Sequence, residues 1–123
     1  MVGHVLLIED EPNIIEAIRF ILSRDGWQVS VCCEGDGAIA AVRAGRPDVV
    51  ILDVMLPGRS GFEILADLKA DSDLSATRVL MLTAKGQVKE REAAERAGAD
   101  RFMTKPFANA EFLAAVRALG GAA

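Results

Sequence analysis

Three short runs of consecutive apolar residues constrain the fold of this chain more than any other feature. They are Val5–Ile8, Val49–Leu52 and Val79–Leu82. Four apolar residues in a row, bounded by polar ones, are typical of a parallel strand that helices cover on both faces. Two weaker segments, Val29–Val31 and Phe102–Met103, are short or alternate with polar residues, which suits the edges of a sheet. We therefore expect five strands, with the three apolar runs in the centre.

Helical patterns with recognisable ends separate these segments. We expect helices from Pro12 to near Gly26, over about Gly37–Ala44, from Ser60 onward, over about Gln87–Ala97 and around Phe112–Leu119. Strict alternation of strand and helix predicts an α/β fold, a (βα)5 doubly wound parallel sheet with right-handed crossovers. With the apolar runs central, the strand order is 2-1-3-4-5, which is the flavodoxin-like order.

The apolar stripes of the helices predict which side chains pack on the sheet. Ser60 and Glu63 have the spacing of a capping box, which marks the start of the third helix. The fourth helix has only Val88 and alanines on its apolar side, so we expect it to be the least firmly packed. The other side chains expected in the core are Ile14, Ile15, Ile18, Ile21, Leu22, Phe62, Leu65, Leu68, Phe112, Leu113, Val116 and Leu119.

Length and composition limit the classes of protein to consider. A chain of 123 residues suits one hydrophobic core, so we expect residues 1–123 to form a single domain. No apolar run approaches the roughly 18 residues of a membrane helix, and a strand pattern rather than a signal peptide follows Met1. We expect a cytoplasmic protein with free thiols at Cys32 and Cys33 and a surface histidine at His4. The net charge of −4 gives no reason to expect nucleic acid or membrane binding by this domain.

Polar residues follow four of the predicted strands at the point where each strand ends. Glu9 and Asp10 follow the first strand, Asp53 the third, Thr83 the fourth and Lys105 the fifth. Each has an ordinary structural explanation, because acidic residues favour helix N-termini and threonine often ends a strand. Together they meet at one edge of the sheet, where ligands bind in folds of this order. We therefore expect a functional site there.

The charges at this edge suggest its chemistry. Asp10 and Asp53 should lie within a few ångströms of each other with Glu9 behind them, and uncompensated carboxylates so close repel. A hard divalent cation with oxygen ligands relieves the repulsion, and Mg²⁺ suits the site. A metal beside a carboxylate nucleophile describes phosphoryl transfer to Asp53. Lys105 and Thr83 would then contact the phosphoryl oxygens.

Four stretches of the sequence resemble the receiver domain of two-component response regulators. They are residues 5–12 (VLLIEDEP), 47–58 (PDVVILDVMLPG), 82–84 (LTA) and 98–107 (GADRFMTKPF), and the resemblance covers essentially the whole chain. It implies the receiver fold, a site that phosphorylates and dephosphorylates itself, and roles for individual residues. By this resemblance Asp53 is the phosphoacceptor and a metal ligand with Asp10, Glu9 acts on the metal through water, Met55 contributes its backbone carbonyl, Thr83 and Lys105 contact the phosphoryl group, and Phe102 is the switch aromatic.

The resemblance also implies partners. The donor would be a phosphohistidine on a sensor histidine kinase or phosphotransfer protein, and the fourth helix, fifth strand and fifth helix would form the surface that changes. A cis peptide is usual in the family at Lys105-Pro106, and we expect it here. Phe102 stands where the transcription-factor branch has tyrosine, and without a hydroxyl it should favour a buried orientation. Arg101 replaces an acidic residue of that branch, and Ala115 lacks a charge, so we expect no tight symmetric dimer on phosphorylation.

Alternative functions remain to be weighed. An aspartate-nucleophile phosphatase of the haloacid-dehalogenase type needs a general acid two residues after the nucleophile, where this chain has Met55. That argues against a turnover enzyme. A flavodoxin-like cofactor binder needs a glycine- and hydroxyl-rich loop after the first strand, but residues 9–12 read Glu-Asp-Glu-Pro and would repel phosphate. The receiver portion of a DNA-binding transcription regulator stays open as an alternative output.

Overall fold

Five parallel strands form one sheet. The computed structural model describes residues 3–84 and 88–120. The strands are β1 (His4–Ile8), β2 (Gln28–Cys32), β3 (Val49–Asp53), β4 (Arg78–Thr83) and β5 (Arg101–Thr104). Their order is β2-β1-β3-β4-β5, and every neighbouring pair is parallel. The predicted fold class and strand order are confirmed, and each strand extends the predicted apolar segment by one or two residues.

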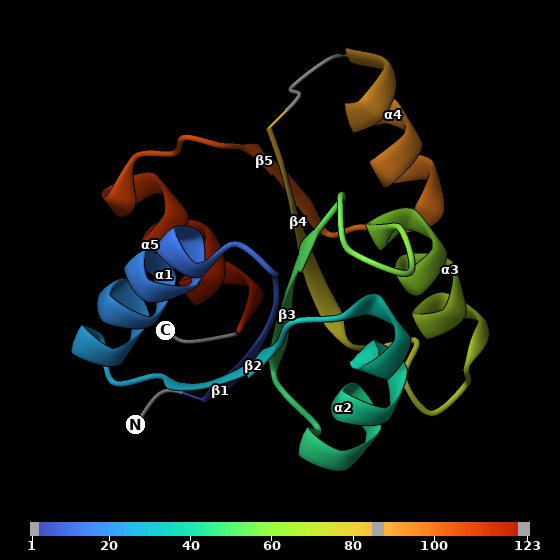
Figure 1. The fold of residues 1–123 in the computed structure, drawn as a ribbon, viewed down its shortest axis with the longest axis horizontal. Coiled ribbons are helices and arrows are strands. Elements are labelled where there is room, and N and C mark those ends of the chain that lie inside the picture. The colour runs from blue at the N-terminus through green and yellow to red at the C-terminus, as the bar shows by residue number, and fades with distance from the viewer. Residues whose placement is uncertain (1–2, 85–87, 121–123) are drawn as a thin grey trace.

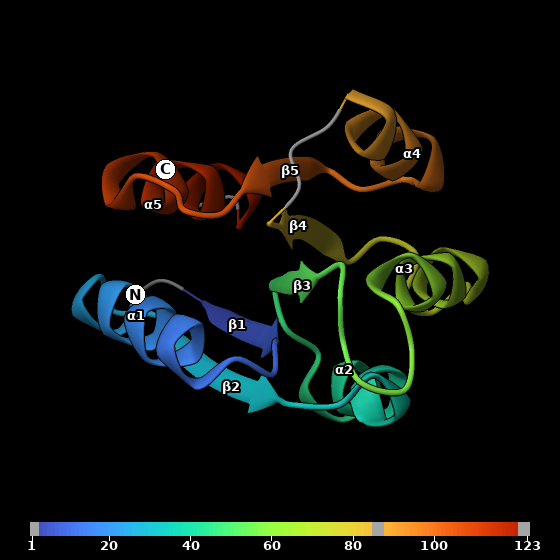
Figure 2. The ribbon, with the colours of Figure 1, turned by 45° about the horizontal axis from the view of Figure 1, so that its top comes forward.

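Helices cover both faces of the sheet (Figure 1). They are α1 (Pro12–Arg24), α2 (Ala38–Gly45), α3 (Gly61–Ala70), α4 (Val88–Ala97) and α5 (Asn109–Leu119), with a short 3₁₀ turn, η1 (Gly35–Gly37), before α2. Figure 2 shows α1 and α5 on one side of the sheet and α2, α3 and α4 on the other. The predicted helices are confirmed within a few residues, except that Gln87, expected in the fourth helix, lies outside the described residues.

The sheet separates two apolar clusters. One lies between the sheet and α1 and α5, and it includes Leu7, Ile18 and Phe112. The other lies between the sheet and α2, α3 and α4, and it includes Leu52, Leu65 and Phe102. Every residue of β3 is buried, because this central strand has helices over both of its faces.

Some side chains of the helices pack differently from the prediction. In α3 the buried positions are Ile64, Leu65 and Leu68, whereas Phe62 is only half-buried against the same cluster. The predicted stripe is confirmed for Leu65 and Leu68, and Ile64 joins it because a helical face is wider than the three positions chosen to represent it. In α4 the prediction for Val88 was wrong: its side chain is 70% exposed and Ala94 is the buried residue. Ala115, noted above for lacking a charge on the fifth helix, is 2% exposed and belongs to the core.

Local signals at the helix ends are confirmed. Pro12 occupies the first turn of α1. The Ser60 hydroxyl accepts a hydrogen bond from the Glu63 amide, and the Glu63 carboxylate accepts one from the Ser60 amide, which completes the capping box of α3. Among residues 3–84 and 88–120, no helix has the length and apolar character needed to cross a bilayer.

The cysteines and the histidine have no role in a metal or catalytic cluster within the described chain. Both thiols are free: Cys32 is half-buried and Cys33 is exposed. The His4 ring shares a hydrogen bond of 2.8 Å with the Ser30 hydroxyl, so this histidine is accounted for by a local contact between β1 and β2.

Candidate functional site

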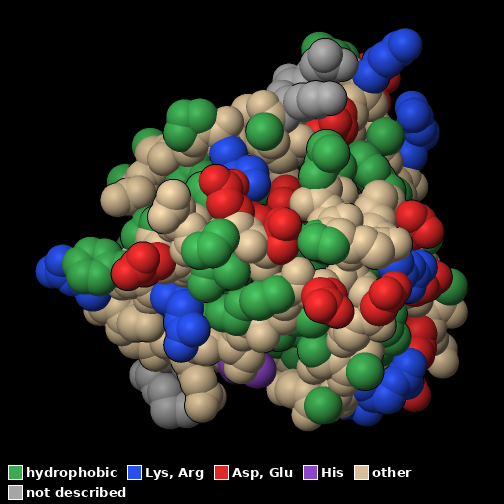
Figure 3. Space-filling view, viewed as in Figure 1, with side chains coloured by type: hydrophobic (Ala, Val, Ile, Leu, Met, Phe, Trp, Pro, Cys, Tyr) green, Lys and Arg blue, Asp and Glu red, His purple; other side chains and the backbone are tan. Residues whose placement is uncertain are grey.

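The carboxyl ends of the central strands bring three acidic side chains together. Glu9 and Asp10 follow β1, and Asp53 is the last residue of β3. One ligand atom from each of these carboxylates lies within 4.8 Å of the others. Figure 3 shows acidic side chains beside a basic one near the middle of this face. The predicted convergence of the three acids is therefore present.

Glu9 is a fully buried carboxylate, and it is held from two sides. Its Oε2 accepts hydrogen bonds from the backbone amides of Asp10 (3.0 Å) and Glu11 (3.3 Å). Its Oε1 accepts a hydrogen bond from Lys105 Nζ at 3.1 Å. Both oxygens therefore have donors, which makes the buried charge tolerable. The side chain of Asp10, by contrast, is exposed and faces the open part of the site.

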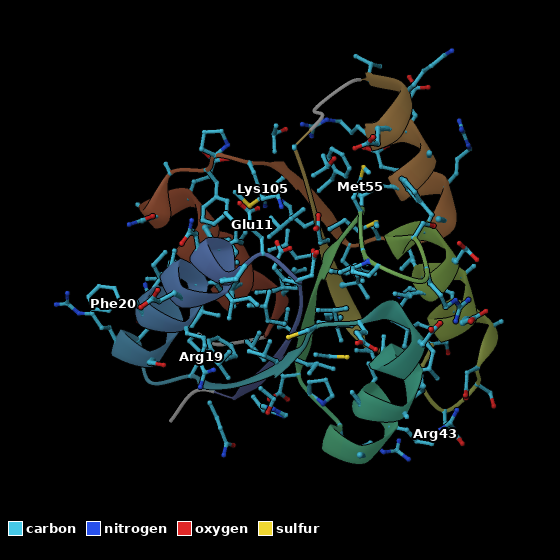
Figure 4. The ribbon with its side chains drawn as sticks, in the orientation of Figure 1. Glu11, Arg19, Phe20, Arg43, Met55 and Lys105 are labelled. Atoms are coloured by element: carbon cyan, nitrogen blue, oxygen red, sulfur yellow. The ribbon has the colours of Figure 1, made fainter. Side chains whose placement is uncertain are left out.

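Lys105 supplies the positive charge of the site. Its Nζ lies 3.1 Å from Glu9 Oε1 and 3.5 Å from Asp53 Oδ1, and its side chain is 12% exposed. Burial alone would lower the pKa of Lys105, but the carboxylates of Asp53 and Glu9 raise it above its usual value. The Lys105-Pro106 peptide is cis, as expected. Figure 4 shows Lys105 beside Glu11, at the end of the sheet where the acidic residues lie.

The carboxyl group of Asp53 is a weaker acid than that of an ordinary aspartate. Its side chain is almost completely buried, and burial together with the neighbouring Glu9 carboxylate raises the pKa of Asp53 to about 7. The ammonium of Lys105 and a hydrogen bond from the Met55 amide act in the opposite direction but do not cancel this rise. A carboxylate that is costly to ionise responds strongly to any added positive charge.

The first residue of α3, Gly61, lies close against the backbone of Asp53 and Val54. The Gly61 amide donates to the Val54 carbonyl at 2.7 Å, which closes the base of the loop between β3 and α3. A side chain at Gly61 would overlap the carbonyl oxygen of Asp53. The loop carries Met55, whose side chain is 68% exposed at the rim of the site.

Thr83 is the last residue of β4, and Phe102 lies within β5. Thr83 is 2% exposed, and its carbonyl accepts a hydrogen bond of 2.7 Å from the Lys105 amide. Phe102 is 6% exposed, in line with the expectation for a ring that has no hydroxyl. The guanidinium of Arg91 on α4 lies 5.3 Å from the centre of this ring. A cation over an aromatic face is a favourable contact.

A cavity of about 470 Å³ opens over the cluster. Its lining combines acidic, basic and apolar residues: Asp10, Glu11, Pro12, Asp53, Met55, Ala84 and Lys105. Oxygen atoms from several carboxylates, with room for water, are the donor set that Mg²⁺ prefers. Because Glu9 already accepts hydrogen bonds on both oxygens, Asp10 and Asp53 are the carboxylates best placed for direct contact with a cation.

Sequence reasoning missed the groups that fix these carboxylates from behind. They are the amides of Asp10, Glu11 and Met55 and the close approach of Gly61 to Asp53. Backbone amides carry no sequence signature. The glycine directly after the Ser60 cap was the only available hint, and its significance depends on a contact that a sequence does not display.

Comparison with known proteins gives a consistent result. Residues 5–117 match the family described as "Response regulator receiver domain". The chain is 44% identical over 115 residues to the probable transcriptional regulatory protein TcrX of Mycobacterium tuberculosis, covering 94% of this chain and 48% of that protein. It is 36% identical over 119 residues to the phosphate regulon transcriptional regulatory protein PhoB of Escherichia coli, covering 97% and 52%. The chain thus spans about half the length of the curated relatives it matches.

Solved structures share the fold closely. A putative response regulator from Chloroflexus aurantiacus superposes with a TM-score of 0.93 at 26% identity, covering 98% of this chain and 99% of that one. The receiver domain of the sensor histidine kinase PA1611 from Pseudomonas aeruginosa, with a magnesium ion in its active-site cleft, gives 0.89 at 25% identity, covering 99% and 100%. The BeF3-activated receiver domain of RstA from Klebsiella pneumoniae gives 0.89 at 26% identity, covering 95% and 97%.

Proposed function

Because this chain belongs to the response regulator receiver domain family of two-component signalling, we propose that residues 1–123 form one receiver domain and that Asp53 is its phosphoacceptor. The observation that carries the proposal is the meeting of Glu9, Asp10 and Asp53 within 4.8 Å, beside the ammonium of Lys105. Receiver domains of this family bind Mg²⁺ and are not turnover enzymes. The family match and the acidic cluster together leave no support for the phosphatase or flavin alternatives.

The residues that would hold the cation follow from their positions. Asp10 and Asp53 would bind Mg²⁺ through their carboxylates, the Met55 carbonyl would add a third ligand, and Glu9 would act through a water molecule. When bound, Mg²⁺ supplies positive charge that neutralises the carboxylates and the phosphoryl oxygens. Burial and the neighbouring Glu9 carboxylate, which together raise the pKa of Asp53, indicate the same need for a cation.

The transfer itself is a displacement at phosphorus. An Oδ atom of Asp53 attacks the phosphorus of a phosphohistidine, the phosphorus–nitrogen bond breaks, and the imidazole nitrogen keeps the electron pair. Lys105 then binds one phosphoryl oxygen through its ammonium. The Thr83 hydroxyl donates to another oxygen. Water that later attacks the phosphorus breaks its bond to Asp53, releases inorganic phosphate and returns Asp53 to its carboxylate form.

The partner and the output are further parts of the proposal. A sensor histidine kinase or a histidine phosphotransfer protein would supply the phosphoryl group, and both would place this chain in the cytoplasm. Phe102 and Thr83 would connect the phosphorylated site to the surface formed by α4, β5 and α5. A second candidate output is transcription control by a DNA-binding regulator of which this chain is the receiver part. Its support is the 44% identity to TcrX, about half of which the chain spans.

Labelling with a small phosphodonor tests the assignment. With acetyl phosphate and Mg²⁺, the wild-type chain should gain the mass of one phosphoryl group, and Asp53→Asn should gain none, because an amide is not a nucleophile here. Asp36→Asn is the matched control, since Asp36 lies in the η1 turn outside the acidic cluster, and it should label like the wild type. Full labelling of Asp53→Asn would exclude Asp53 as the acceptor.

A further inference from the structure

The loop that carries Met55 is fastened at its outer part to a second loop. It comprises residues 54–60 and connects β3 with α3. The amide of Gly35, in η1, donates a hydrogen bond of 3.3 Å to the carbonyl of Pro57. The hydrogen bond at the base of the loop and this contact lie on either side of Met55. The position of the Met55 backbone therefore depends on a residue that is remote from it in sequence.

Gly35 leaves no room for a side chain at this contact. It is buried, and a Cβ atom added to it would lie 2.8 Å from the Cβ of Arg59 and 3.1 Å from both the backbone nitrogen and the backbone oxygen of Arg59. Backbone atoms cannot rotate away as a side chain can, so a methyl group here must displace residue 59. The φ angle of Gly35 is not positive, so alanine can adopt its conformation. The need for glycine comes from the contact with Arg59.

The side chain of Arg59 ties the same part of the loop to α3. Its Nη2 lies 2.6 Å from Oδ2 of Asp67. The carboxylate of Asp67, with smaller contributions from Glu63 and Asp36, raises the pKa of Arg59 above its usual value. The outer part of the loop is thus held on one side by η1 and on the other by Asp67 of α3.

We propose that Gly35 and Arg59 are positioning residues for the divalent cation: their contact sets where the Met55 backbone lies relative to Asp53, and so the affinity for Mg²⁺. The inference rests on the proposed function, because it requires the Met55 carbonyl as a ligand. The Met55 amide already donates to Asp53, so a shift of the loop disturbs the nucleophile as well. Mg²⁺ demands near-ideal octahedral geometry, and small displacements of one ligand weaken its binding.

The Kd for Mg²⁺ tests this inference without any phosphodonor. It is obtained from the rise of the melting temperature with Mg²⁺ concentration, for the wild type, Gly35→Ala and Gly37→Ala. Gly37 is the matched control: it lies in the same turn, and a Cβ there would meet only the Cys32 sulfur at an ordinary 3.8 Å. We expect the Kd of Gly35→Ala to rise about tenfold, as outer-shell changes typically do. The Kd of Gly37→Ala should stay at the wild-type value.

Two results of this titration would contradict the inference, and they can be told apart. Equal Kd values for Gly35→Ala and the wild type would overturn it while leaving the metal site intact. A wild-type chain whose melting temperature ignores Mg²⁺ would overturn it together with the proposed function on which it rests.

Arg59→Ala gives a second and independent measurement, which decides the matter if Gly35→Ala does not fold. Loss of a positive charge near the acidic cluster should by electrostatics alone tighten Mg²⁺ binding. Loss of the Arg59–Asp67 ion pair should release the loop and so weaken Mg²⁺ binding, by at least about twofold. Weaker binding supports the positioning role, and unchanged or tighter binding overturns it. Arg43→Ala is the control, because Arg43 of α2 forms a comparable ion pair with Asp71, with 2.8 Å between Nη2 and Oδ2.

Discussion

Asp53 combines the role of nucleophile with a burial that opposes its charge. Its pKa in the folded chain is about 7, against 3.8 for an ordinary aspartate, so the folded state binds the proton more tightly than the unfolded state does. Ionisation of Asp53 therefore reduces the free energy of unfolding. The loss is absent below about pH 4 and complete above about pH 7. In the metal-free protein this residue makes folding less favourable at neutral pH.

We therefore predict that Asp53→Asn stabilises the metal-free protein at pH 8. The gain should be about 1–2 kcal/mol, less than the full shift implies, because water in the open cavity and nearby groups relax around the ionised carboxylate. At pH 4 the two proteins should differ little, since Asp53 is protonated there. Urea unfolding in the presence of a chelator at both pH values measures the difference. A variant that is less stable than the wild type at pH 8 would show that the charge of Asp53 does not destabilise the folded protein.

For single residues of the site, the sequence predicted which side chains would meet but not which neighbouring groups hold them in place. Asp10, Asp53, Thr83 and Lys105 were located because each ends or follows a strand, and parallel strands end at one edge. The complete burial of Glu9 and the contact of Gly35 with Arg59 were not foreseen. Both depend on backbone groups and on loops that meet only after folding, and neither feature produces periodicity in the sequence.

Among the helices, α1 carries an exposed aromatic side chain that belongs to neither of the two apolar clusters. Phe20 is 61% exposed, and Figure 4 shows it projecting away from the helix. A cavity of about 280 Å³ lies between α1 and α5, lined by apolar Phe20, Ile21 and Leu113 together with polar residues. The guanidinium of Arg24 lies 5.3 Å from the centre of the Phe20 ring. Because α1 begins directly after the acidic residues and Phe20 lies about 12 Å further along the helix, a protein large enough to cover both could dock over Asp53 and contact this groove.

We predict that Phe20→Ala slows phosphotransfer from a phosphorylated histidine kinase, or phosphotransfer protein, that labels the wild-type chain. The rate should fall at least about tenfold, because an exposed aromatic ring at an interface is a common hot spot. Labelling by acetyl phosphate should not change, since Phe20 is remote from the acidic cluster. Val88→Ala, which removes a 70% exposed side chain from α4, is the control. Equal losses with both phosphodonors would point to a damaged fold rather than a docking surface.

At the level of elements, periodicity predicted the strands and helices well and individual buried faces less well. The apolar runs became the central strands because helices on both faces leave no polar position in them. The faces of α3 and α4 were harder to assign. Ala94 and Ala115 are buried where helices approach closely, and alanine is compatible with either a surface or a core position.

At the scale of the whole molecule, the surface formed by α4, β5 and α5 determines whether two copies of the chain can pair. Two charged residues of this surface, Arg91 and Asp100, already have partners within this chain. Arg91 covers the ring of Phe102. The Asp100 carboxylate accepts a hydrogen bond of 2.8 Å from the Val79 amide and lies 3.6 Å from Arg78. The expectation that Ala115 leaves a charge missing from this surface was wrong, because Ala115 is in the core.

We therefore predict that the chain stays monomeric at low micromolar concentration when beryllofluoride and Mg²⁺ mimic phosphorylation. Pairing through this surface would first require Arg91 to leave Phe102 and Asp100 to leave its backbone partner. Sedimentation velocity with and without beryllofluoride measures the outcome. A shift to dimer that Arg91→Ala abolishes would contradict the prediction and would favour the transcription-control output.

The division of the interior by the sheet has a consequence for how such a protein can diverge. Side chains under α1 and α5 form one apolar cluster and those under α2, α3 and α4 form another, with the strands between them. A substitution that reshapes the groove between α1 and α5 is repacked by neighbours on its own side of the strands. Its neighbours do not include the side chains under the opposite layer of helices, which belong to the other cluster. Duplicated copies of such a chain can thus acquire new donors by changes in one layer while the contacts made by the other layer are inherited unaltered.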